Sequence, residues 1–138
     1  MGGVYQNLGL FAQAEPLEKA ALDVRRKALG NNHPDVGRSL SALGTVYNRL
    51  GRYTEAETLQ REAVAVLISS LGAENPDVAE AQTQLGLTCL QLGRPQEAES
   101  LYRVALATRE SALGPNSPEV ATNLTHLGHL LNNQGRSK

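Results

Sequence analysis

Large aromatic residues are almost missing from this sequence: it has no tryptophan, one phenylalanine and four tyrosines among 138 residues. Methionine and cysteine also occur only once each, the cysteine being Cys89. A single cysteine excludes an internal disulfide and fits a reducing compartment, so we expect a cytoplasmic protein. Any core must be built from leucine, valine and alanine, whose small side chains allow helices to approach closely.

The sequence also has no large excess of positive or of negative charge. Thirteen lysines and arginines stand against fourteen aspartates and glutamates, which gives a net charge of −1. This balance favours neither nucleic acid nor a highly charged substrate as a partner. No apolar run approaches the roughly 20 residues of a membrane-spanning helix, and the first residues do not resemble a signal peptide. We therefore expect no nucleic-acid partner and no membrane partner.

What the sequence does contain is an internal repeat of 42 residues. The segment LGNNHPDV at 29–36 recurs, with substitutions, as LGAENPDV at 71–78 and as LGPNSPEV at 113–120. The same spacing relates Gly9, Gly51, Gly93 and Gly135; Gly44, Gly86 and Gly128; Ala14, Ala56 and Ala98; and Leu17, Leu59 and Leu101. Repetition of this kind indicates an array of similar supersecondary units.

Each unit has the apolar periodicity of two α-helices. After Val36 the apolar residues follow at steps of three and four, and a second such stripe begins at Ala56. In the repeated segments at 29–36, 71–78 and 113–120, which connect one unit to the next, the glycine suits a left-handed C-cap and the proline suits the first turn of the next helix. The shorter breaks at Gly51 and Gly93 predict a tight turn inside each pair. Pro16 is an exception, since it lies several residues into its helix and should bend the first turns.

We therefore predict an all-α protein, a solenoid of antiparallel helix pairs with about seven helices. The chain should form a single domain, with units at approximately 1–33, 34–75, 76–117 and 118–138, of which the first and last are partial. The first unit should begin at Tyr5 inside a shortened first helix, with the second helix around Ala14. The partial end units indicate a segment of a longer array.

The repeat resembles the tetratricopeptide pattern, in which x2-L-G-x2-Y on one helix is followed by A-x3-F on the next. The two most complete units read Leu40-x2-Leu43-Gly44-x2-Tyr47 then Ala56-x3-Gln60, and Gln82-x2-Leu85-Gly86-x2-Cys89 then Ala98-x3-Tyr102. The 42-residue period is similar to that of kinesin light chain repeats. This resemblance implies a right-handed superhelix that acts as a non-catalytic protein-interaction scaffold, with the first helix of each unit on the concave side.

The resemblance to kinesin light chain does not extend to its cargo contacts. Its repeats usually carry two asparagines that contact cargo peptides, before the Leu-Ala of the first helix. The matching positions of this chain are Ser41-Ala42, Thr83-Gln84 and Thr125-His126. We therefore do not expect the same cargo specificity.

The residues capable of catalysis or metal binding do not form a recognisable constellation. His126 and His129 are three residues apart and would share a helix face, but the spacing fixes no third metal ligand. Cys89 replaces the tyrosine of the repeat on an apolar stripe, which favours buried packing over a nucleophilic role. The sequence therefore predicts no enzyme, no cofactor and no metal site.

The first helix of each unit carries a largely polar strip beside its buried stripe. The strip consists of Arg38, Ser41, Thr45, Asn48, Glu80, Thr83, Leu87, Leu90, Thr122, Thr125, His129 and Asn132. Equivalent positions on stacked helices adjoin, so we expect these residues to line a concave groove. Their hydroxyl, amide and imidazole groups suit a peptide backbone, and the two leucines suit an apolar side chain. The predicted function is binding of a peptide or helix of a partner protein.

Self-association is the alternative prediction. Repeat arrays need polar capping faces for solubility, yet the last helix of this sequence has no second helix after it. Leu127, Leu130 and Leu131 should therefore remain partly uncovered and pair with another copy of the chain.

Overall fold

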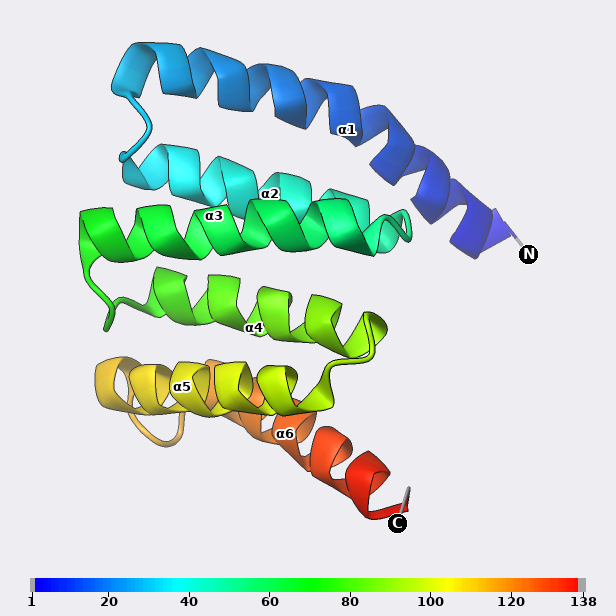
Figure 1. Cartoon of the computed structure of the whole chain (residues 1–138), viewed down its shortest axis with the longest axis vertical. Helices are drawn as coiled ribbons and strands as arrows, with labels where there is room; N and C mark the ends of the chain where they lie inside the picture. Colours follow the sequence, from blue (N-terminus) through cyan, green and yellow to red (C-terminus); the bar gives the residue numbers. More distant parts are fainter. Residues whose placement is uncertain (1, 137–138) are drawn as a thin grey trace.

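The computed structural model describes the backbone of residues 2–136 and the side chains of residues 12–133. Within the described backbone, every regular element is an α-helix (Figure 1). The six helices of this part are α1 (Gly2–Leu29), α2 (Pro34–Arg49), α3 (Tyr53–Leu71), α4 (Pro76–Gln91), α5 (Pro95–Leu113) and α6 (Pro118–Arg136). Successive helices run antiparallel and stack into one array, which confirms the predicted solenoid of helix pairs.

Short turns built around a glycine join α2 to α3 and α4 to α5. In the first turn Gly51 has a φ of +79°, and Arg52 donates its backbone N–H to the carbonyl oxygen of Tyr47 at 2.8 Å. The second turn repeats this bond from Arg94 to Cys89 at 2.8 Å. Each bond adds a second N–H to a carbonyl oxygen in the last turn of the first helix, and it fixes the turn that sets the pair antiparallel.

The longer connectors end at a proline that begins the next helix, as predicted for α2, α4 and α6. Before α4, the side chain of Asn75 accepts the backbone N–H of Asp77 at 2.9 Å. Before α2, Nδ1 of His33 accepts the backbone N–H of Asp35 at 3.1 Å. The imidazole of His33 thus caps α2 with the same kind of hydrogen bond that the amide of Asn75 makes to α4, although histidine is less favoured as an N-cap residue.

Two glycines allow the helices of a pair to pack closely. A Cβ atom at Gly44 would lie 2.6 Å from Cγ of Gln60, and one at Gly86 would lie 2.7 Å from Cε1 of Tyr102. Cys89 is fully buried beside the second contact, which confirms its predicted packing role. The glycine of each Leu-Gly motif is therefore required by the contact of α2 with α3 and of α4 with α5.

The first unit differs from the prediction of a shortened helix at Tyr5 and a second helix around Ala14. Instead, α1 runs unbroken from Gly2 to Leu29, so the described residues form six helices rather than about seven. Gly9 does not stop the helix, since glycine costs only about 1 kcal/mol relative to alanine in a helix interior. A separate helix of about eight residues would be marginal in water, so one continuous helix is favoured.

A bend in α1 accompanies its internal proline. Pro16 lies inside the helix, and the N-terminal half of α1 curves away from the direction of the rest (Figure 1). Proline removes one backbone hydrogen bond and clashes with the preceding turn, which bends a helix rather than ending it. The predicted effect of Pro16 is thus consistent with the shape of α1.

Candidate functional site

A cleft of about 280 Å³ lies between α2 and α4, and we call it the α2–α4 groove. Four residues of the predicted strip line this cleft: Arg38, Ser41, Thr45 and Glu80. The remaining lining residues are Ala42, Leu67, Asp77 and Gln84. The fold therefore brings together the first part of the predicted strip, and it adds two apolar side chains that the periodicity of one helix did not reveal.

A second cleft, of about 250 Å³, adjoins the first one between α1 and α2. Arg38 and Ala42 line both clefts, so the two are continuous across α2. The other residues of the second cleft are Glu18, Arg25, Asp35 and Ser39. Because charges of both signs alternate along this surface, it offers no uniform field to a charged ligand.

Arg38 connects α2 with α4 at the centre of this surface. Its Nε and Nη2 atoms donate to Oδ2 of Asp77 at 3.1 and 2.7 Å, and its Nη1 donates to Oδ1 of Asp35 at 3.0 Å. The hydrogen bond to Asp77 raises the pKa of the Arg38 guanidinium. Two carboxylates already neutralise this cation, so the groove lacks a free clamp for an acidic ligand.

Glu80 pairs with a buried arginine of α5. Arg109 donates from Nη2 to Oε2 of Glu80 and from Nη1 to Oδ1 of Asn123 on α6. Removing one partner of such a pair leaves a buried charge uncompensated, so Glu80 also has a structural role. Arg109 was not predicted from the sequence, although it lies two periods after Arg25, which donates in the same way to Ser39 at 2.5 Å.

Thr83 was predicted to line the groove, and this prediction is wrong. The residue is only 2% exposed. Its Oγ1 donates to the carbonyl oxygen of Ala79 at 2.9 Å and accepts from Nδ2 of Asn123 at 3.1 Å. Asn123 of α6 reaches Thr83 across the gap between units, a contact that the periodicity of α4 alone does not reveal.

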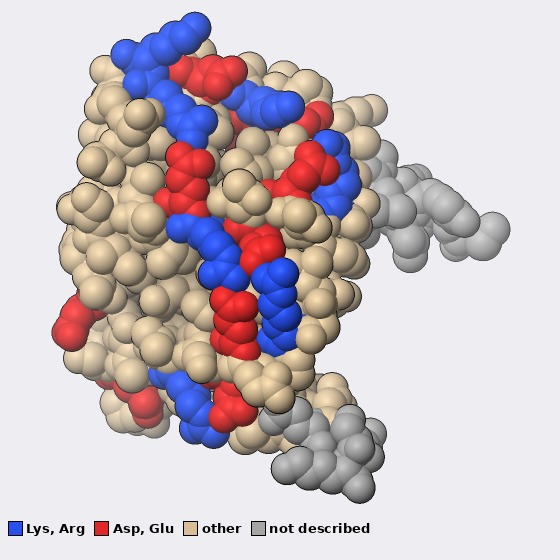
Figure 2. Space-filling model, viewed as in Figure 1, with Lys and Arg blue, Asp and Glu red and all other residues tan. Residues whose placement is uncertain are grey.

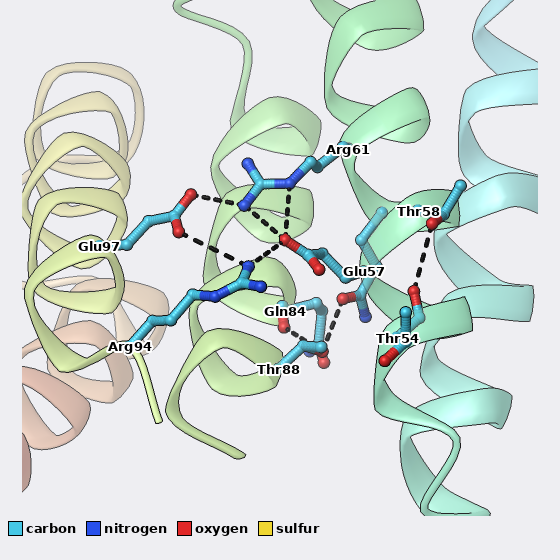
Figure 3. A network of polar contacts seen from close by, with 9 residues as sticks. Thr54, Glu57, Thr58, Arg61, Gln84, Thr88, Arg94 and Glu97 are labelled. Carbon is cyan, nitrogen blue, oxygen red and sulfur yellow. Dashed lines mark hydrogen bonds and ion pairs between the residues drawn. The ribbon is translucent and has the colours of Figure 1, made fainter. Parts of the chain in front are cut away.

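Asn48 lies on the predicted side of α2, but its amide is engaged inside the protein. Its Nδ2 donates to Oγ1 of Thr88 at 2.6 Å, and Thr88 in turn donates to Oε1 of Gln60 at 2.6 Å. Figure 3 shows Thr88 beside Gln84 on α4, on the side that faces α3. The three side chains link α2, α3 and α4, so Asn48 holds the helices together rather than facing a ligand.

The rest of the predicted strip is divided between the core and the surface. Leu87 and Leu90 are half-buried against the apolar cluster that contains Cys89 and Tyr102. The residues on α6 are exposed, namely Thr122, Thr125, His129 and Asn132. Their part in binding a ligand stays a prediction.

The titratable residues near α6 are arranged for packing. His126 stacks on Tyr102, with ring centroids 5.6 Å apart and planes at 23°. Burial lowers the pKa of His126, raises the pKa of Tyr102 to about 12 and raises the pKa of the Cys89 thiol. Among the described residues there is no group of three or more metal-ligating side chains. Nor does any helix in that part of the chain have the length and hydropathy to cross a membrane.

Charged side chains gather on another face, which α1, α3 and α5 form. Figure 2 shows lysine and arginine alternating with aspartate and glutamate along this face. Ion pairs connect the neighbouring helices, with Arg26 and Glu62 at 2.5 Å and Arg61 and Glu97 at 2.5 Å. Such exposed pairs contribute only about 0–1 kcal/mol each. Since the charges pair with one another, this face is a weaker candidate for ligand binding than the α2–α4 groove.

Comparison with known proteins agrees with this geometry. The sequence pattern of the tetratricopeptide repeat matches residues 1–69 and again residues 40–111. The crystal structure of BtubC (BKLC) from P. vanneervenii is similar, with 30% identity and a TM-score of 0.83 over 94% of this chain and 51% of that one.

A Podosopora anserina putative kinesin light chain with nearly identical TPR-like repeats is also similar. Its identity is 25% and its TM-score 0.84, over 95% of this chain and 62% of that one. A second crystal structure, of a variant of the same protein, gives the same values. The chain therefore spans about half of the first structure and less than two thirds of the second. No protein of curated function matches the sequence.

Proposed function

Because the chain belongs to the tetratricopeptide repeat family, we propose that it is a non-catalytic scaffold that binds a peptide or helix of a partner protein in the α2–α4 groove. Repeats of this family generally mediate protein–protein interactions. The observation that carries the proposal is the cleft itself, in which Arg38, Ser41, Thr45 and Glu80 of two successive units meet. Concave surfaces of stacked repeats are suited to extended ligands.

The chemistry of the groove favours an extended peptide with a small apolar side chain. Ala42 supplies exposed apolar surface above the buried Leu67, while Ser41 and Gln84 supply groups that hydrogen-bond a peptide backbone. Arg38 is already bound to two carboxylates, so a strongly acidic ligand gains little from it. We therefore propose a ligand of low net charge and modest affinity.

The proposal includes no chemical step, cofactor or metal. The one thiol, Cys89, is buried and burial raises its pKa, which disfavours the thiolate form. We further propose that residues 1–138 act as a single domain and that the protein works in the cytoplasm, where a lone buried cysteine stays reduced.

Blocking the groove without disturbing the core tests the proposed function. Ala42 is exposed and lines both clefts, so Ala42→Arg places a long side chain where the ligand is expected. Ala65 is exposed on α3 outside the groove, and Ala65→Arg is the matched control with the same added charge. A displayed library of random peptides is selected on the wild-type protein, and the selected peptides are then titrated against both variants.

We expect the selected peptides to bind Ala42→Arg about tenfold or more weakly than the wild type, and to bind Ala65→Arg as the wild type does. Circular dichroism checks that both variants keep their helices. Equal binding to all three proteins would place the ligand elsewhere, and a selection that yields no peptide would also count against the groove.

A further inference from the structure

The last helix presents an apolar face that the described residues leave open. Leu124 is 51% exposed and Leu131 is 41% exposed. A Cβ atom at Gly128 would meet no atom of the described residues within 4 Å. By contrast, Leu127 and Leu130 were expected to remain partly uncovered, but they are buried in the core cluster beside α5, so the open face is narrower than predicted.

The positions of this open face correspond, by the 42-residue period, to the positions through which α2 contacts α3 and α4 contacts α5. Gly128 lies one period after Gly86 and two periods after Gly44. In those two helices the hollow at the glycine is filled by a side chain from the second helix of the pair, Tyr102 or Gln60. The hollow on α6 has the same form and lacks such a side chain among the described residues.

The first helix presents the opposite half of the same contact. Leu17 is 72% exposed and Val24 is 65% exposed on α1. They lie one period before Leu59 and Val66 of α3. Val66 is buried against α2, where its Cγ1 lies 3.3 Å from the position of a Cβ atom at Gly37. The helix α1 thus carries the side chains that suit a helix like α2, and α6 carries the surface that suits a helix like α3.

We propose that these two faces bind each other between copies of the chain, so that α6 of one molecule packs antiparallel on α1 of a second, as α2 packs on α3. The two helices lie at opposite ends of the array (Figure 1), so the two faces of one molecule do not contact each other. Such an interface is heterologous, so association proceeds head to tail and does not close at the dimer. This proposal is independent of the α2–α4 groove.

Glu18 sets the strength of this contact. Glu18 lies one period before Gln60 and two periods before Tyr102, the residues that fill the hollows at Gly44 and Gly86. Its side chain would therefore enter the hollow at Gly128 of the second molecule. Glu18 shares a cleft with Arg25 and Arg38, but burying a carboxylate remains costly unless a cation forms a close ion pair with it. Association is therefore weak, and Glu18→Gln, which copies the residue of the α2–α3 pair, strengthens it.

Sedimentation velocity over a concentration series measures the association of the wild type and of one variant for each face. Gly128→Leu fills the hollow on α6, and since the site is open, the variant folds as a monomer. Val24→Glu places a charge on the face of α1. The matched controls, Thr122→Leu and Ala65→Glu, introduce the same two residue types at exposed positions outside the two faces.

We expect the average mass of the wild type to rise with concentration, and each face variant to associate about tenfold or more weakly while the controls behave as the wild type does. Mixing the two face variants should restore association, because each supplies the face that the other lacks. The mixture should stop at a 1:1 dimer, since no intact face is then left at either end.

Three results would overturn the proposal. The first is a wild type that stays monomeric at every concentration. The second is loss of association with Gly128→Leu but not with Val24→Glu, which would indicate contact between two α6 faces. The third is a mixture of the two variants that remains monomeric.

Discussion

Two equivalent regions of the protein connect neighbouring units in different ways. We call the contact of α1 with α2 and α3 the first joint, and the contact of α3 with α4 and α5 the second joint. In the second joint, Arg61 reaches Glu97 and Arg94 reaches Glu57, both at 2.5 Å, so two ion pairs cross from α3 to α5 (Figure 3).

The first joint lacks these two cross-links. Arg52, equivalent to Arg94, stacks on the ring of Tyr47 at 4.4 Å and pairs with Glu55 of its own helix at 2.7 Å. Lys19, equivalent to Arg61, pairs with Glu15 within α1 at 3.6 Å. A cleft of about 380 Å³ remains between α1 and α3, and Lys19, Tyr47 and Glu55 are among its lining residues.

Two positions of the repeat differ between the joints, since Lys19 replaces Arg61 and a tyrosine replaces a cysteine, and the second of these explains the missing contact of Arg52 with Glu15. Tyr47 in the first joint corresponds to Cys89 in the second. The tyrosine ring occupies the space over which the arginine would pass, and its hydroxyl donates to Glu15 at 2.7 Å. The smaller cysteine leaves that path open, so Arg94 reaches Glu57 directly. A single side-chain volume thus decides whether this part of a joint is bridged by an ion pair or by a tyrosine hydroxyl.

The largest expected effect comes from removing a core leucine of the second joint. Leu85 is buried, so Leu85→Ala should lower the free energy of unfolding by about 2–5 kcal/mol and make both neighbouring units unfold together. The equivalent Leu43→Ala should cost less, because Leu43 borders the cleft and its neighbours can relax. Thermal and denaturant melts measure both. A loss below about 1 kcal/mol for Leu85→Ala would show that the second joint is not tightly packed.

A smaller effect distinguishes the rigidity of the two joints. Gly86→Ala forces a methyl group against the Tyr102 ring and should cost about 1–3 kcal/mol. Gly44→Ala meets Cγ of Gln60, which is buried and hydrogen-bonded to Thr88 but can change its χ angles where a ring cannot, so this variant should cost less. Parallel urea titrations of both variants measure the difference. Equal costs would mean that side-chain shape at these hollows does not separate the joints.

The smallest effect concerns the pH dependence of the ion pairs. Burial raises the pKa of Glu57, but hydrogen bonds from Arg61 and Arg94 outweigh this effect, and the pKa is lowered. A carboxylate with a lowered folded-state pKa stabilises the fold above its unfolded pKa, and this contribution is lost as the pH falls through the folded value. Glu57→Gln should therefore make the free energy of unfolding fall less as the pH is lowered. At neutral pH the same variant should lower that free energy by about 1 kcal/mol.

The matched variant for this experiment is Glu15→Gln in the first joint. The pKa of Glu15 is lowered mainly by a hydrogen bond from the hydroxyl of Tyr47, which is a neutral partner. We therefore expect Glu15→Gln to change the loss of stability at acid pH less than Glu57→Gln does. Melts from neutral to acid pH compare the two variants. An equal or larger change for Glu15→Gln would contradict the distinction between the joints.

Much of the candidate groove could be predicted from periodicity, and its errors have a common cause. Arg38, Ser41 and Thr45 line the α2–α4 groove because they lie beside the buried stripe of α2, whose partners are near in sequence, while their part in binding a ligand stays a prediction. Thr83 and Asn48 were assigned to the surface by the same rule, yet they contact residues 40 positions further along the chain. Their role depends on a neighbouring helix that the pattern of one helix does not describe.

By itself, the sequence determined the repeating unit of this protein: the period, the glycine and proline positions that end and begin helices, and the apolar stripe of each helix. These are local properties, governed by backbone conformation and by hydrophobic periodicity along one helix. Only the tertiary structure decided that α1 is continuous, that Arg109 is buried and that the two joints are linked differently. Those outcomes depend on volumes and hydrogen-bond partners brought by helices remote in the chain, which repetition of the sequence does not specify.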